Sequence, residues 1–144
     1  MKLPLILLLL FLGSCCSQDA RLVIHSVPVG FSGPMAIVEA GDVLGSAGLP
    51  LVDSAVEVVW DSNGVVLMRA WERVSVGKNH RFEDSAGGSV MGQSLGSTVH
   101  GGGGRSVHVF WLYCGPENDA REFMSSRAST KVEWLRRHRV PIPD

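Results

Sequence analysis

Residues 55–71 read AVEVVWDSNGVVLMRAW, and this stretch decides the fold class. Two runs of β-branched, aliphatic and aromatic residues, 55–60 and 65–71, flank the sequence DSNG at 61–64. Such runs favour strands, and an Asn-Gly pair supplies the positive φ angles that a tight turn between antiparallel strands requires. The pattern therefore predicts a β-hairpin over residues 55–71.

Other segments predict strands that would join this hairpin. Residues 21–29 (RLVIHSVPV) are β-rich, and Pro28 restricts them to the edge or end of a sheet. Residues 107–113 (VHVFWLY) are apolar at nearly every position, as in a buried strand, and residues 35–38 are a short candidate. Together they predict a small antiparallel sheet.

Residues 83–105 are rich in Gly and Ser, which predicts a long loop. Loops of this length tend to be functional or mobile. We therefore expect this segment to separate the hairpin from the strand at 107–113.

A C-terminal helix is predicted between Pro116 and Pro141. Apolar residues recur there at three- and four-residue spacing, and acidic residues at its start and basic residues at its end complement the helix dipole. The segment SRAST at 126–130 interrupts the pattern, so two shorter helices are an alternative. The sequence thus predicts an α+β fold, in which a small antiparallel sheet is packed by a C-terminal helix.

Length and composition are those of one ordinary domain. The chain has 144 residues, of which 45% are hydrophobic and 19% charged, and its formal net charge is -1. With this balance of charges the chain lacks the net positive charge that is typical of nucleic-acid-binding proteins. We therefore expect one domain over residues 18–144 and no nucleic-acid partner.

The first 17 residues have the layout of an export signal. Lys2 precedes an apolar run of about ten residues that ends at Leu12, and small residues follow. The run is roughly half of what a helix needs to cross a bilayer. We expect a signal peptide over residues 1–17 and an extracytoplasmic domain.

The end of this segment, LGSC at 12–15, resembles the bacterial lipobox. That resemblance implies cleavage before Cys15 and a diacylglycerol on its sulfur, which would anchor the protein to a membrane. Cleavage near Ser17, with release of the domain, is the alternative. Lipidation would leave Cys16 and Cys114 able to form a disulfide.

Three strings resemble parts of a serine hydrolase. GQSLG at 92–96 fits the nucleophile elbow, while DSAGG at 84–88 and HGGGG at 100–104 resemble motifs of hormone-sensitive-lipase-like esterases. An elbow needs a strand before its serine and a helix after it, and neither is predicted here. The glycines at 88, 92 and 96 have the spacing of a close helix contact, but the run is short and polar. We expect none of these strings to be catalytic.

Cys114 lies between a predicted strand and a predicted helix start, where a thiol can become a reactive thiolate. A Cys/His hydrolase would take its base from one of the four histidines that precede it, among which His100 and His108 are closest in sequence (His25, His80, His100, His108). A buried structural cysteine is the other interpretation.

Nothing in the residue spacing indicates a metal or cofactor site. The RRHR run at 136–139 would suit anionic lipid or another polyanion, or a processing site in a eukaryote, or it is a solvated helix end. The leading hypothesis is an exported, non-enzymatic binding or envelope-associated domain with an unknown protein or small-molecule ligand. The alternative is a small hydrolase that uses Cys114 as its nucleophile.

Overall fold

The computed structural model describes residues 22–39, 51–52, 55–68, 79–101 and 106–143. Within these residues, eight strands are followed by two helices. The elements are β1 (Leu22–Val27), β2 (Gly33–Glu39), β3 (Leu51–Val52), β4 (Ala55–Val59), β5 (Val65–Met68), β6 (Asn79–Asp84), β7 (Gly92–His100), β8 (Val107–Cys114), α2 (Glu117–Ser125) and α3 (Ala128–Arg137).

The strands form two separate sheets of four. Sheet A has the order β3-β4-β1-β6, and sheet B has the order β5-β2-β8-β7. In sheet A, β1 is parallel to both β4 and β6. In sheet B, β2 is parallel to β5, while β8 runs antiparallel to β2 and β7. β1 and β2 therefore occupy inner positions, one in each sheet.

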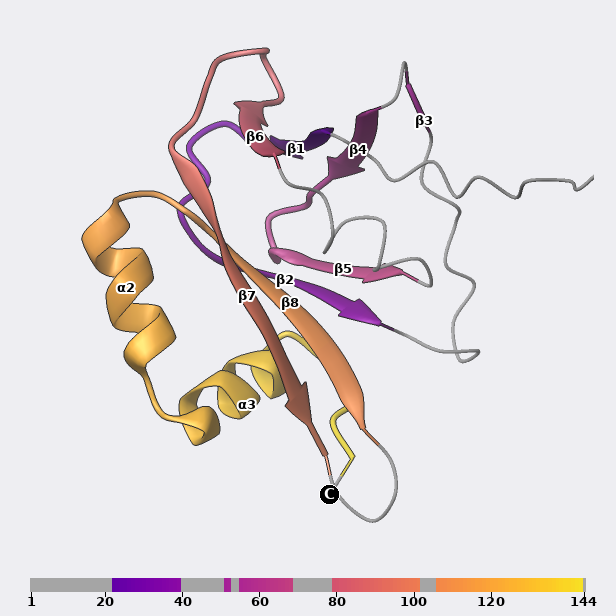
Figure 1. The fold of residues 1–144 in the computed structure, drawn as a ribbon, viewed down its shortest axis with the longest axis vertical. Coiled ribbons are helices and arrows are strands. Elements are labelled where there is room, and N and C mark those ends of the chain that lie inside the picture. The colour runs from indigo at the N-terminus through magenta and orange to yellow at the C-terminus, as the bar shows by residue number, and fades with distance from the viewer. Residues whose placement is uncertain (1–21, 40–50, 53–54, 69–78, 102–105, 144) are drawn as a thin grey trace, which may run out of the picture.

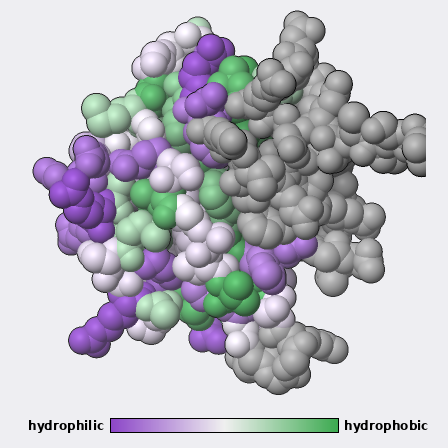
Figure 2. Space-filling view, in the orientation of Figure 1, coloured by the Kyte–Doolittle hydropathy of each residue, from purple (hydrophilic) through white to green (hydrophobic). Residues whose placement is uncertain are grey.

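Sheet A packs on one face of sheet B, and the two helices cover the other face (Figure 1). The core between the sheets includes Val23, Met35 and Leu112, all fully buried. The core beneath the helices is built around Trp111 and Leu135. Because side chains alternate along β8, each face of this strand supplies one of the two cores. Figure 2 shows hydrophilic surface gathered over α2, whose solvent-facing residues are mostly charged.

The α+β class and the strands near 21–29 and 107–113 are confirmed, but the single antiparallel sheet is only partly right. The prediction of a hairpin over 55–71 is wrong, because β4 pairs with β1 in sheet A and β5 pairs with β2 in sheet B. The DSNG turn does form: the Asp61 carboxylate accepts the backbone N–H of Asn63, and Gly64 has φ +67°. The turn carries the chain from one sheet to the other.

The prediction of a loop over residues 83–105 is wrong for the central part of this segment. Residues 92–100 form β7, which pairs with β8 along its whole length. A bulge lies between Ser94 and Gly96, where Gly96 takes φ +106°. At Gly92 a Cβ atom would overlap the Phe82 ring, so the glycine permits a close approach of β6 and β7. The serine motif at 92–96 is therefore an edge strand, and the glycines at 92 and 96 do not lie on a helix.

The C-terminal helical segment is two helices, which is the alternative that the sequence left open. α2 ends at Ser125 and α3 begins at Ala128, so the break falls within the SRAST segment. The ammonium of Lys131 donates to the carbonyl oxygens of Met124 and Ser126, both at 2.9 Å. A side chain of the second helix thus closes the C-terminal end of the first.

The predicted signal over residues 1–17, with Cys15 and Cys16, lies outside the described residues. The same holds for the end of the expected hairpin at 69–71. In the part of the chain that the structure describes, neither helix has the length and apolar character needed to span a bilayer.

Candidate functional site

Cys114, the candidate nucleophile, ends β8 and is fully buried between the sheets. Its thiol donates a hydrogen bond to the carbonyl oxygen of Phe31, at a sulfur–oxygen distance of 3.4 Å. Burial raises the pKa of Cys114, which disfavours the thiolate that a nucleophile must become. The side chain behaves as a small apolar group of the core.

The structure does not bring Cys114 together with His108 or His100, the two candidate bases closest to it in sequence. His108 lies on the same strand, but six residues of extended chain separate the two by roughly 20 Å. His100 lies on β7, opposite Val107 of β8, and packs edge-on against Trp111 beneath the helices. Trp111 and Cys114 belong to the cores on opposite faces of sheet B. The geometry therefore shows no Cys/His dyad among these residues.

His100 instead belongs to a short hydrogen-bonded chain beneath the helices. The indole N–H of Trp111 donates to Thr98 Oγ1 at 2.7 Å, and this oxygen lies 2.6 Å from Nε2 of His100. The Thr98 hydroxyl, which can accept two hydrogen bonds and donate one, thus links the indole to the imidazole. Burial lowers the pKa of His100, and the positive charge of Lys131 lowers it further. A neutral imidazole here orders the Thr98 and Trp111 side chains.

A second polar chain, which sequence reasoning did not identify, lies in the core between the sheets. The indole N–H of Trp60 donates to Nδ1 of His25 at 3.1 Å, and Nε2 of His25 lies 2.9 Å from Nδ1 of His80. His25 is fully buried, and Phe82 stacks on its ring with 4.7 Å between ring centroids. Burial, with the neighbouring His80 as a smaller cause, lowers the pKa of His25 to about 3.

The sequence did hold a signal for His25, because it alternates with Val23 and Val27 on the buried face of β1. Its partner is 55 residues away and is brought beside it by the parallel pairing of β1 and β6. Within the described ranges no three His, Cys, Asp or Glu side chains gather as metal ligands would. Because both ring nitrogens of His25 have partners and Phe82 packs on its ring, we regard Trp60, His25 and His80 as a structural polar chain.

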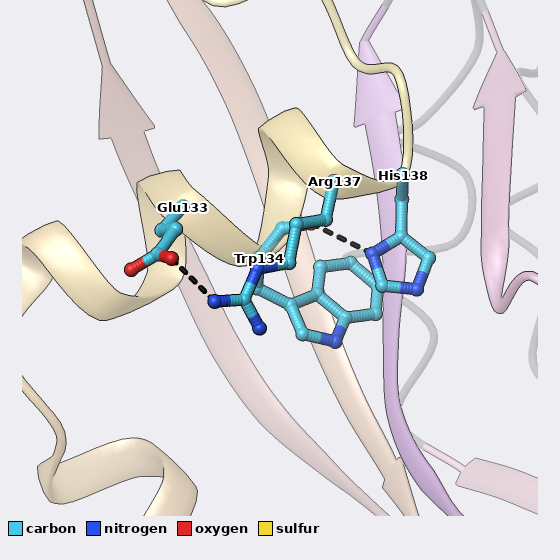
Figure 3. A network of polar contacts seen from close by, with 4 residues as sticks. All are labelled: Glu133, Trp134, Arg137 and His138. Atoms are coloured by element: carbon cyan, nitrogen blue, oxygen red, sulfur yellow. Dashed lines mark hydrogen bonds and ion pairs between the residues drawn. The ribbon is translucent and has the colours of Figure 1, made fainter.

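The end of α3 carries three exposed arginines within four residues, Arg136, Arg137 and Arg139. We call Trp134, Arg136, Arg137, His138 and Arg139 the α3 terminus cluster. The His138 ring stacks on Trp134 with 3.9 Å between centroids, and its Nδ1 lies 2.7 Å from the Trp134 carbonyl oxygen (Figure 3). Arg137 pairs with Glu133 one turn earlier. The indole of Trp134 also packs edge-on against Trp111, which fixes it to the helix-side core.

Arg139 gives this helix end an unusual backbone. Its φ is +61°, and every other residue with positive φ in the described segments is a glycine. The backbone N–H of Val140 reaches back to the carbonyl of Leu135 at 3.0 Å, which closes the helix in the manner of a left-handed C-terminal cap. An arginine thus occupies a position that normally favours glycine.

Comparison with known proteins supports the fold. One solved structure, a crystal structure described as a "putative lipoprotein" from Bacillus anthracis, superposes on this chain with a TM-score of 0.54. The match covers 85% of this chain and 96% of the other, at 10% sequence identity. At this identity the likeness establishes a shared fold only. No protein-family model matches the sequence, and no curated protein matches it either.

Proposed function

We propose that this chain is an exported, non-enzymatic binding domain, tethered to the outer face of a membrane by a lipid on Cys15. The observation that carries the proposal is the sequence LGSC at 12–15, a lipobox-like string directly after an apolar export segment. The similarity in fold to a protein described as a putative lipoprotein supports the same interpretation.

The interior of the domain favours binding over catalysis. Cys114 is buried and hydrogen-bonded to Phe31, and strand geometry separates it from His108. His100 is directed to Thr98 beneath the helices. A Cys/His hydrolase would need a thiol that substrate can reach and a base within hydrogen-bonding distance of it. These side chains instead order the two cores.

The tether is tested by the intact mass of the protein recovered from the membranes of a bacterial host. Wild type is expected to lack residues 1–14 and to carry a diacylglycerol group on Cys15. It should also partition into the detergent phase on phase separation. Replacing Cys15 by alanine should abolish both properties, while Cys16→Ala, a change at the neighbouring cysteine, should leave them intact.

An unmodified protein that begins near Gln18 and is recovered from the medium would overturn the tether and indicate a secreted domain. Loss of the adduct in Cys16→Ala but not in Cys15→Ala would place the lipid on Cys16 and would also contradict the proposal.

A further inference from the structure

Sheet B ends in a long strand that has a neighbour on one side. β7 pairs with β8, and among the described strands none pairs with its other side. The strand has nine residues, 92–100, and none of them is Asp, Glu, Lys or Arg, although these types make up 19% of the chain. β7 is thus an uncharged edge strand.

The other described edges of the two sheets are protected against pairing. An exposed edge strand invites another strand to pair with it, and proteins usually limit this by keeping such strands short or charged. β3 and β5 have two and four residues. The edge strand β6 carries three charged residues, Arg81, Glu83 and Asp84. β7 departs from both patterns, which indicates that its edge is kept available for pairing.

The second half of β7 is the part that is open to a further strand. The start of β7 lies against β6, where Gly92 approaches the Phe82 ring, and the bulge between Ser94 and Gly96 interrupts the strand. Beyond the bulge, residues 96–100 pair regularly with β8 and extend away from sheet A (Figure 1). Val99 lies in this half and is 60% exposed.

The ladder with β8 determines which backbone groups of this half point outward. In an antiparallel pair, successive residues direct their N–H and C=O groups alternately toward the partner strand and away from it. The backbone N–H of Gly115 donates to the carbonyl oxygen of Met91. Followed along β8 in steps of two residues, this alternation makes Thr98 face β8. The N–H and C=O groups of Ser97 and Val99 are therefore directed away from the sheet.

These four outward groups are complementary to a second copy of themselves. If two β7 strands pair antiparallel about a two-fold axis at Thr98, Ser97 of each copy lies opposite Val99 of the other. Each such pair exchanges two N–H···O=C bonds, so all four groups of each copy gain a partner. The lack of charge suits this arrangement, because a strand that pairs with itself would bring any charge close to its own copy.

We propose that a second copy of this chain docks on residues 96–100 of β7, so that the two B sheets join into one continuous sheet. Val99, largely exposed in one copy, then packs beside Ser97 of the other. Because main-chain hydrogen bonds make up most of this small interface, we expect a weak dimer that forms with rising concentration. The inference concerns the domain itself and is independent of the lipid on Cys15.

The first test is sedimentation equilibrium of the full chain in a Cys15→Ala/Cys16→Ala background. We expect a reversible monomer–dimer equilibrium. Ser97→Lys/Val99→Lys should raise the dimer dissociation constant at least about tenfold, because each cross-strand pair then holds two like charges. The matched control, Val59→Lys/Ser62→Lys, makes the same replacements at exposed positions outside β7 and should dimerise like the parent protein. Thermal melting of both variants shows whether each is folded.

The second test measures the register by disulfide trapping in the same background. A mixture of the Ser97→Cys and Val99→Cys proteins should form a mixed disulfide dimer on mild oxidation, because these positions lie opposite each other. In either protein alone the two thiols are offset by two residues along the strands. Their Cα atoms then lie about 8 Å apart, too far for a disulfide. Intact mass distinguishes the mixed dimer from the like-paired ones.

A parent protein that stays monomeric at every concentration would overturn the proposal. So would a lysine variant of β7 that dimerises like the control, or cross-links that form as readily in each cysteine variant alone as in the mixture. A parent protein that stays monomeric but binds a synthetic peptide of alternating valine and threonine would assign the edge to a foreign strand instead.

Discussion

Nε2 of His25 lies 2.9 Å from Nδ1 of His80, in a core where Trp60 already donates to the other ring nitrogen of His25. With Nδ1 accepting from the indole, Nε2 carries the hydrogen and donates it to His80. Both nitrogens of the buried ring are therefore engaged, and an additional proton on Nδ1 would displace the Trp60 hydrogen bond. This relationship makes the neutral imidazole part of the folded state.

We predict that His25 makes the domain sensitive to acid. Its pKa is about 3 in the folded protein and about 6.5 in an unfolded chain, so the unfolded state binds more protons between these values. The stabilisation is complete above about pH 6.5 and is lost as the pH falls toward 3. The free energy of unfolding should fall by about 1.4 kcal/mol per pH unit from this group alone. Urea denaturation at a series of pH values measures this slope.

The control for this prediction lies on the same face of β1. In the variant His25→Leu, the free energy of unfolding should fall less steeply as the pH is lowered below about 6.5. The variant Val23→Ala should instead lower the free energy of unfolding by a similar amount at every pH. Parallel curves for wild type and His25→Leu would show that the acid sensitivity arises elsewhere.

We predict that Cys114 is unreactive in the folded protein. Its thiol is buried, donates to Phe31 and has a raised pKa, so alkylation should require opening of the core. In a Cys15→Ala/Cys16→Ala background, iodoacetamide should modify native protein far more slowly than a model thiol and should modify urea-unfolded protein completely. Native labelling at the rate of the model thiol would revive the hydrolase interpretation.

We predict a steric coupling between Gly92 and Phe82. A Cβ at position 92 would overlap the ring, so Gly92→Ala should lower the free energy of unfolding by about 1–3 kcal/mol. Phe82→Leu also costs stability, but the double variant should lose less than the sum of the two single variants. Strict additivity in this double-mutant cycle, measured by chemical denaturation, would contradict the contact.

We predict that Arg139→Gly stabilises the domain by about 1 kcal/mol, because glycine adopts φ +61° without the steric cost of a side chain. Arg139→Ala removes the same charge but keeps the Cβ, so it should not share the gain. Thermal melting of both variants provides the comparison. An equal gain in the alanine variant would mean that charge, and not backbone conformation, limits stability at this position.

Local sequence patterns predicted the elements better than their pairing. β1, β8 and the helical segment follow from residue type and spacing, and SRAST marks the helix break. The turn at 61–64 was also recognised, but a turn between two apolar strands looks the same whether the strands pair together or enter different sheets. Only the long-range partners, β1 for β4 and β2 for β5, distinguish the two cases.

The candidate site was harder to predict because its defining features depend on tertiary contacts. The glycines at 92 and 96 resemble loop residues in the sequence. In the structure, Gly92 leaves room for the Phe82 ring, and Gly96 lies at a β-bulge. The position of Cys114 was predicted between strand and helix, but its burial depends on sheet A. The RRHR run at 136–139 was visible in the sequence, whereas the left-handed backbone at Arg139 was not.

The placement of the first two strands bears on how the chain acquires its fold. β1 and β2 are inner strands, and their neighbours β6 and β8 come from much later in the chain. Neither sheet can be completed until those late segments are present, so the contact order is high and folding is expected to be slow. Under the proposed export, this delay would be an advantage. The emerging polypeptide would remain threadable by the translocation machinery, and the stable domain would assemble only after crossing.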